Sequence, residues 1–186
     1  RIGKSFLNAG IGWGGSCFPK DLSAFIRIAE KHRVDASLLR AVVDLNEAQK
    51  TSFVEKIQKN LWNLKGKTIG VLGLSFKAGT DDMRSAPSID IINALLAEGV
   101  KVQAYDPEAI PVARALFKDV TFVKSAYDAA KGADALVVLT EWPEFLEMDF
   151  KRLKKMMNHP VIFDGRNLYE RSRVEKAGFE YFGVGR

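Results

Sequence analysis

The chain has a single cysteine and two histidines among its 186 residues, and this shortage excludes several kinds of site. One thiol cannot form an internal disulfide bond, and so few cysteines and histidines cannot supply the ligands of a structural zinc site. His32 and His159 lie far along the sequence from Cys17, which disfavours a papain-like hydrolase, and both histidines are expected at the surface. The scarcity of cysteine fits a reducing, cytoplasmic setting.

Long apolar runs are absent as well. No window contains the roughly 20 apolar residues of a membrane helix, so no membrane partner is expected. The chain starts at Arg1 without an initiator methionine or a visible signal peptide, so we expect it to be the later part of a longer protein. The net charge is +5, but the basic residues are mixed with acids and no aromatic-plus-basic module of an RNA-binding kind is present. This balance suits an anionic small ligand and predicts no nucleic-acid partner.

Two helices are predicted in the first third of the chain. A short amphipathic helix should start at Asp21, and its buried face would consist of Leu22, Phe25, Ile26 and Ala29. A second helix should run from residues 35–37 to Leu61, about 25 residues or roughly 38 Å. Asn46 and Gln49 lie on its apolar stripe, either as a polar layer in a helix–helix contact or at the margin of the stripe. A helix of this length is a natural dimer surface.

The pattern changes after Lys65 to short β-branched runs that alternate with helical stretches. One of these stretches, around Ile92, should be a helix capped by Ser85, with Pro87 in its first turn and Gly99 at its end. Apolar strands alternating with helices predict an α/β fold, a doubly wound and mostly parallel sheet. The strands are expected within residues 68–74, 100–105, 134–140 and 160–164, with weaker candidates at 119–123 and 179–184.

Ligands of such sheets bind outside the carboxyl ends of the strands. Lys77, Arg84 and Arg166 all follow predicted strands, so we expect three cations at one crevice suited to phosphates. The first strand-to-helix turn, GVLGLSFK, lacks the third glycine of the dinucleotide fingerprint and continues into a long loop. The domain is therefore expected to bind a mononucleotide or nucleotide sugar through side chains.

The cysteine lies in the segment GIGWGGSCFPKD, Gly10 to Asp21. Two interpretations stay open: a small buried hydrophobe, or a nucleophile whose thiolate is favoured by a helix N-terminus and by Lys20. Glycines before it would let the backbone approach a ligand closely. In the second interpretation Cys17 attacks a carbonyl, and Asp21, one helical turn later, orients water or a hydroxyl.

Several motifs together resemble a known family. FLNAGIGWGGSCFPKD resembles the active-site segment of UDP-glucose 6-dehydrogenases of the UDP-glucose/GDP-mannose dehydrogenase family, and GLSFKAGTDDMRSAPS, YDP, TEW and FDGRN resemble their later motifs in the same order. The resemblance implies an active-site loop and central dimerisation helix in residues 1–64. It implies a Rossmann-like UDP-sugar-binding domain in residues 65–186, and an NAD-binding domain that is absent from this chain.

The resemblance also implies an activity: the NAD-dependent, four-electron oxidation of UDP-glucose to UDP-glucuronate. Cys17 would be the nucleophile that forms a thiohemiacetal and then a thioester, and Asp21 would assist proton transfers. The family's active-site lysine and asparagine precede this segment, so the isolated chain is expected to be inactive. Alternatives are a related GDP-mannose or UDP-N-acetylhexosamine dehydrogenase, and a non-catalytic nucleotide-sugar-binding dimerisation fragment.

The implied binding residues fall into two groups. Cys17, Lys20 and Arg84 would contact NAD, and Arg1 would reach into the nucleotide site of a neighbouring subunit in a homodimer. The residues around the UDP-sugar would be Arg1, Phe6, Leu7, Asn8, Ala9, Gly10, Gly14, Phe76, Lys77 and Arg166.

Overall fold

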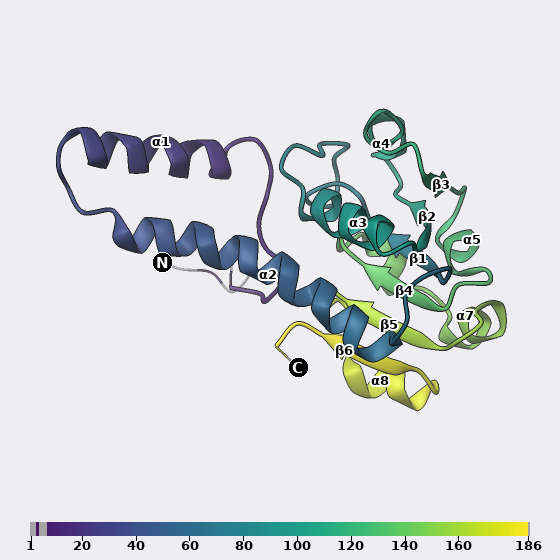
Figure 1. Ribbon diagram of the computed structural model, residues 1–186. Coiled ribbons are helices and arrows are strands. Elements are labelled where there is room, and N and C mark those ends of the chain that lie inside the picture. The colour runs from purple at the N-terminus through teal and green to yellow at the C-terminus, as the bar shows by residue number, and fades with distance from the viewer. Residues whose placement is uncertain (1–2, 4–6, 186) are drawn as a thin grey trace.

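A computed structural model describes residue 3 and residues 7–185 of the chain. Two helices form an arm on one side of a sheet that is covered by helices on both faces (Figure 1). The sheet has six strands, all paired in parallel, in the order β3-β2-β1-β4-β5-β6. This is the doubly wound α/β fold that the sequence predicts, and the two weaker strand candidates are confirmed as β3 and β6. The strands are β1 (Thr68–Leu72), β2 (Lys101–Tyr105), β3 (Val120–Phe122), β4 (Ala135–Val138), β5 (Val161–Asp164) and β6 (Glu180–Gly183).

The apolar core has two halves, one on each face of the sheet. Successive residues of a strand point to opposite faces, so Val71 belongs to one half and Leu72 to the other. The first half packs under α2 (Ser37–Leu61), α3 (Pro87–Ala97) and α4 (Ile110–Leu116). The second packs under α5 (Ala126–Ala130), α6 (Pro143–Leu146), α7 (Phe150–Met156) and α8 (Arg171–Lys176). Burial on both faces explains why the three central strands, β1, β4 and β5, are almost continuously apolar, whereas β2, β3 and β6 also carry polar residues.

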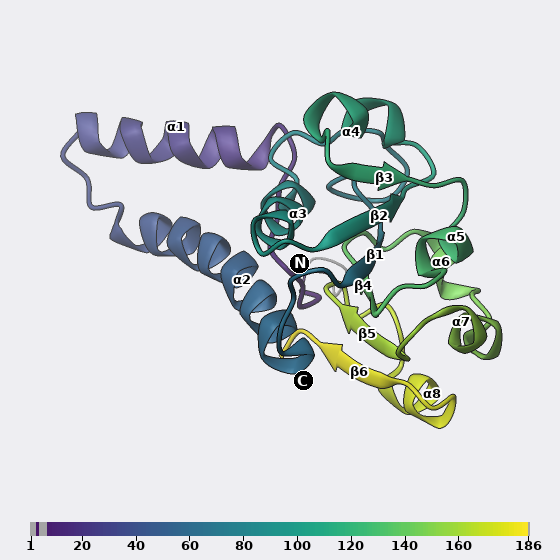
Figure 2. The same ribbon diagram turned by 45° about the vertical axis from the view of Figure 1, so that its right-hand side comes forward.

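The arm consists of α1 (Phe18–Lys31) and the outer part of α2, which lie side by side and extend away from the sheet (Figure 2). α2 has 25 residues and confirms the predicted long helix. α1 begins at Phe18 rather than Asp21, because Pro19 takes its place in the first helical turn. The predicted buried face of α1 is also wrong in part: Phe25 is 61% exposed, and Ala29 is the buried residue. The arm has little around it to cover this face.

The start of α3 differs from the prediction. Ala86 is its N-cap residue, without a side-chain capping bond, and Ser85 lies before it at φ +50°. Pro87 is in the first turn as expected, and the chain leaves the helix through Gly99 at φ +76°. None of the helices within the described residues has the length and apolarity needed to cross a membrane.

A charged cluster joins α2 to α3. The ammonium of Lys50 lies 2.6 Å from a carboxylate oxygen of Glu47 and also bonds Asp90 in the first turn of α3. Burial alone would lower the pKa of Lys50, but the two carboxylates outweigh burial and raise it above its ordinary value. This cluster holds the inner part of the arm against the sheet domain.

Candidate active site

The glycine-rich loop before Cys17 lies against the carboxyl edge of the sheet. The backbone N–H of Ile11 donates to the carbonyl of Gly165, 2.9 Å away, just beyond β5. Gly165 in turn donates to the carbonyl of Val138 at the end of β4, also at 2.9 Å. The side chain of Ile11 is fully buried in the core. The loop is therefore an integral part of the edge where ligands of such sheets bind.

Close packing explains the glycines of this loop. A Cβ on Gly14 would lie 2.2 Å from the carbonyl oxygen of Ser85, far inside van der Waals contact. The next residue, Gly15, donates its N–H to the carbonyl of Arg84 at 2.9 Å. These two glycines let the loop backbone approach the protein's own β1–α3 loop, a role that the sequence alone did not suggest.

Cys17 is exposed at the start of α1. Its sulfur lies 3.7 Å from the hydroxyl oxygen of Ser16, and its carbonyl accepts the N–H of Asp21 at 2.9 Å. The carboxylate of Asp21 pairs with the ammonium of Lys20 at 3.2 Å, and both side chains are exposed. The interpretation of Cys17 as a buried hydrophobe is therefore wrong, and the expected one-turn offset of Asp21 is confirmed.

Two buried carboxylates organise the loops along the same edge, and the sequence reasoning missed both. Asp106, in the YDP motif, is 1% exposed. It accepts hydrogen bonds from the backbone N–H of Leu74, Ser75, Glu108 and Ala109, the hydroxyl of Ser75 and the indole of Trp142 in the TEW motif. A signal was present, because each donor lies at or just after the end of a predicted strand.

Asp164 is the second of these carboxylates. It lies at the end of β5 in the FDGRN motif and is fully buried. It accepts the backbone N–H of Arg166 at 3.0 Å and of Tyr169 at 2.9 Å, and the hydroxyl of Tyr181 at 2.9 Å. Burial, more than the nearby Asp164 charge, raises the pKa of Tyr169. This network fixes the turn that carries Arg166.

Arg166 bridges three loops with its guanidinium. Nε donates to the carbonyl of Leu139 at 2.9 Å, Nη2 to that of Phe76 at 3.0 Å, and Nη1 to that of Gly12 at 3.4 Å. Nε is also 3.1 Å from a carboxylate oxygen of Glu141. Burial lowers the pKa of Arg166, opposed by the charges of Glu141 and Asp164. Arg166 thus connects the glycine loop to the ends of β1 and β4.

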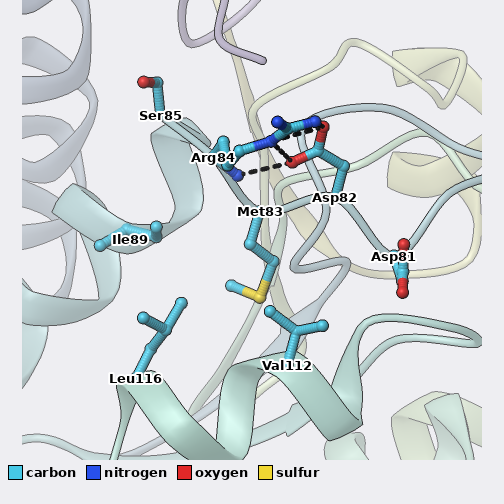
Figure 3. Close-up of a pocket in the computed structure, with 8 residues that line it drawn as sticks. All are labelled: Asp81, Asp82, Met83, Arg84, Ser85, Ile89, Val112 and Leu116. Carbon is cyan, nitrogen blue, oxygen red and sulfur yellow. Dashed lines mark hydrogen bonds and ion pairs between the residues drawn. The ribbon is translucent and has the colours of Figure 1, made fainter. Parts of the chain in front are cut away.

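The other two predicted cations have separate partners. Lys77 is exposed, with its ammonium 5.4 Å from the centre of the Phe76 ring. Arg84 pairs with Asp82 at 2.8 Å, which holds the pKa of Asp82 below its usual range and raises the pKa of Arg84. The pair lies beside a cavity of about 450 Å³ with Met83, Ile89, Val112 and Leu116 on its apolar side (Figure 3).

The structure brings several predicted site residues together. Gly10, Gly14, Phe76 and Arg166 all lie where the glycine loop contacts the sheet edge. Leu7, Asn8 and Ala9 are exposed just ahead of that contact, while Arg1 and Phe6 lie outside the described residues. Asn46 and Gln49 do not form a polar layer between helices, as one reading of the sequence had it. Their side chains bond the backbone of the glycine loop.

The residues expected to face NAD fit an anionic ligand in part. Lys20 and Arg84 are exposed cations at either end of the contact between Gly15 and the β1–α3 loop. The sheet domain itself offers no tight dinucleotide turn, because residues 73–86 form a long loop between β1 and α3.

Comparison with known proteins decides the family. Residues 70–171 match the family model described as the UDP-binding domain of the UDP-glucose/GDP-mannose dehydrogenase family, and residues 1–48 match its central domain. This chain belongs to the UDP-glucose/GDP-mannose dehydrogenase family. The match confirms the resemblance carried by the cysteine segment and the later motifs.

Relatives agree over the whole chain. A UDP-glucose 6-dehydrogenase of Bacillus subtilis, TuaD, is 46% identical, covering 100% of this chain and 41% of the relative. The UDP-glucose 6-dehydrogenase of Pseudomonas aeruginosa is 44% identical, covering 100% of this chain and 43% of the relative. The solved UDP-glucose dehydrogenase of Pyrobaculum islandicum superposes with a TM-score of 0.86 at 34% identity, covering 99% of this chain and 40% of that one. The chain thus spans about two fifths of the length of its relatives.

Proposed function

We propose that this chain is the nucleophile-bearing, UDP-binding part of an NAD-dependent UDP-glucose 6-dehydrogenase. In this proposal residues 1–64 form the active-site loop and a dimerising helical segment, residues 65–186 bind the UDP-sugar, and the NAD-binding domain lies outside the chain. The observation that most supports it is the position of Cys17. An exposed thiol follows directly on a glycine loop that is hydrogen-bonded to the carboxyl edge of a family-matched UDP-binding domain.

The proposed chemistry converts the sugar C6 alcohol to a carboxylate in two oxidations. NAD⁺, when bound, supplies the hydride acceptor for each. At the aldehyde stage the thiolate of Cys17 adds to C6, forming a C–S bond, and the former carbonyl oxygen takes a proton. Loss of hydride from the thiohemiacetal carbon, together with loss of the hydroxyl proton, leaves a thioester. Water then breaks the C–S bond, which releases the carboxylate and restores the thiol.

Asp21 suits the water step of this reaction. Its backbone N–H bonds the Cys17 carbonyl, so the two residues are one helical turn apart. Its carboxylate is exposed and held by Lys20, which leaves lone pairs to accept a hydrogen bond from water. We assign Asp21 to orienting water and moving its proton, and Cys17 to carrying the acyl group.

The UDP-sugar is proposed to lie along the edge of the sheet. Phe76, Lys77 and Arg166 follow β1 and β5, where they present an aromatic ring and two cations to a uridine diphosphate. Lys20, Arg84 and the Cys17 turn would face NAD. The loop residues proposed to surround the sugar nucleotide are Arg1, Phe6, Leu7, Asn8, Ala9, Gly10 and Gly14.

Solved structures of other family members are named for other sugar nucleotides. A structure titled a UDP-D-ManNAc dehydrogenase from Pyrococcus horikoshii has a TM-score of 0.75 at 30% identity, covering 95% of this chain and 40% of that one. The higher identity to relatives named for UDP-glucose favours that substrate. A non-catalytic nucleotide-sugar binder is the alternative from a different functional class.

Calorimetric titration of this chain with UDP-glucose, UDP, GDP-mannose and NAD⁺ tests the proposal. Binding of UDP-glucose and UDP, with GDP-mannose at least about tenfold weaker, is the expected result. Stronger binding of GDP-mannose would replace the substrate, and absence of binding by any UDP compound would contradict the assignment of the sheet domain. A Lys77→Met variant should bind UDP less tightly than the wild type, because it removes a cation near the diphosphate while keeping much of the side-chain volume.

A homodimer through the arm and a cytoplasmic location complete the proposal. The arm leaves large apolar side chains uncovered, among them Leu38 at 76% and Leu45 at 70% exposure. A second copy of the arm would cover them, and the lone exposed thiol fits a reducing compartment. Light scattering after size exclusion should therefore give a dimer, and Leu38→Glu together with Leu45→Glu should give a monomer.

A further inference from the structure

Asn46 of α2 holds the backbone of the glycine loop from the side opposite the sheet. Its Oδ1 accepts the backbone N–H of Trp13 at 2.8 Å, and its Nδ2 donates to the carbonyl of the same residue at 3.3 Å. The Asn46 side chain is 7% exposed. One amide therefore satisfies both backbone groups of a single loop residue, the pairing that a neighbouring β-strand would otherwise supply.

A second amide of α2 extends this contact. Nε2 of Gln49, one turn after Asn46, donates to the carbonyl of Gly10 at 2.9 Å. Between them Gly12 has φ +110°, and a Cβ there would lie 2.8 Å from Oδ1 of Asn46. The loop takes this left-handed conformation directly against the amide, so the two fit each other.

The sheet domain holds the same loop from the other side. Nη1 of Arg166 donates to the carbonyl of Gly12. Gly15, which lies two residues before Cys17, donates its N–H to the carbonyl of Arg84. The loop thus lies between two rigid elements, α2 and the sheet edge. α2 packs into the core of the sheet domain through Phe53, Val54 and Ile57, and Lys50 joins it to Asp90 of α3.

We propose that Asn46 and Gln49 are positioning residues for Cys17. They act through the loop backbone: the amides fix Gly10 and Trp13, the loop then meets Arg84 at Gly15, and the thiol follows at the start of α1. The alternative is that Asn46 only satisfies a buried backbone amide, with no effect beyond Trp13. The importance of the position for sugar oxidation rests on the proposed function, while the positioning itself does not.

Amide hydrogen exchange of the chain, resolved by NMR, separates these readings. In Asn46→Ala we expect exchange at Trp13 to become about tenfold faster, as loss of one buried hydrogen bond requires. Exchange at Gly15 should also become several-fold faster, although Gly15 has no bond to Asn46. Val137, in the middle of β4, should stay within about twofold, which shows that the domain remains folded. Matched controls are Asn60→Ala and Gln58→Ala, which remove the same amides from the exposed part of α2.

Gln49→Ala is the milder second variant, and we expect about threefold faster exchange at Ile11 and Gly15. If Asn46→Ala accelerates Trp13 alone, or if both variants leave Gly15 within error of the controls, positioning is overturned. Faster exchange at Gly15 with Val137 unchanged supports it.

A binding measurement then connects the loop to the site. We expect Asn46→Ala to retain UDP affinity within about twofold and to weaken the protection of Cys17 from iodoacetamide by UDP-glucose about fivefold. Equal losses of UDP affinity and protection would indicate general destabilisation and overturn the selective role. Failure of the wild type to bind any UDP compound would contradict the proposed function, and the exchange experiment would still decide the positioning.

Discussion

Replacing Asp106 by Asn tests whether this buried carboxylate organises the candidate site. Oδ2 of Asp106 accepts four donors, from Leu74, Ser75 and Trp142, and Oδ1 accepts the backbone N–H groups of Glu108 and Ala109. An Asn carbonyl can replace Oδ2, but its amino group then faces the two N–H groups that begin the next turn. The two charge-assisted bonds from the N–H groups of Glu108 and Ala109 are lost, and these N–H groups then face the amino group of Asn, which is itself a donor.

The expected loss of stability is about 3–6 kcal/mol, since two bonds to a charged acceptor are lost and each is worth roughly 1.5–3 kcal/mol. Urea unfolding of wild type and Asp106→Asn, followed by circular dichroism, measures the change in the free energy of unfolding. Asp119→Asn is the matched control, because Asp119 is exposed just before β3 and should change stability by less than about 0.5 kcal/mol. A loss below about 1 kcal/mol for Asp106→Asn, with an unchanged m-value, would refute the role of Asp106 as a central hydrogen-bond acceptor.

Three further perturbations test other parts of the account. Gly14→Ala should destabilise the chain by about 1–3 kcal/mol in thermal unfolding, because the added Cβ overlaps the Ser85 carbonyl. Gly10→Ala should cost less, because its Cβ meets the Gly165 carbonyl oxygen and the Arg166 side chain at 3.3 Å, a tight contact that a small shift relieves. Lys50→Met should lower the free energy of unfolding by about 1–2 kcal/mol at pH 7, measured by urea unfolding. Because the folded-state pKa of Lys50 is raised, its contribution to stability is complete below its unfolded pKa of about 10.4 and is lost as the pH rises through the folded-state pKa. The stabilities of wild type and variant should therefore converge at that higher pH. Cys17→Ser should keep UDP-glucose binding within about threefold, because the role proposed for the thiol is in the chemistry rather than in affinity, and calorimetry checks this.

Periodicity and strand composition were enough to predict most of the fold. α2 and all six strands lie within the predicted ranges. The buried strands β1, β4 and β5 could be predicted because buried parallel strands read as continuous apolar runs. The start of α1 differs from the prediction by three residues, because the apolar periodicity that predicts the helix begins only at Leu22. Phe25 was misplaced because helical spacing identifies an apolar face but not what covers it.

Only part of the candidate site could be predicted from the sequence. Cys17 and Arg166 could be found because a glycine run and a strand end mark them. Asn46 and Gln49 could not, because their role depends on contacts with segments more than 30 residues away along the chain. Sequence spacing predicts neighbours on one element, while these side chains join different elements.

Alkylation of Cys17 by iodoacetamide, with and without UDP-glucose, tests the central claim most directly. Cys17 is the one thiol in the chain, so mass spectrometry reports its labelling without interference. If the UDP-sugar binds at the carboxyl edge with its C6 toward the thiol, saturating UDP-glucose should slow labelling about tenfold, and UDP, which lacks the sugar, should slow it much less. Equal labelling rates with UDP-glucose bound and unbound, under conditions where calorimetry shows saturation, would contradict the account.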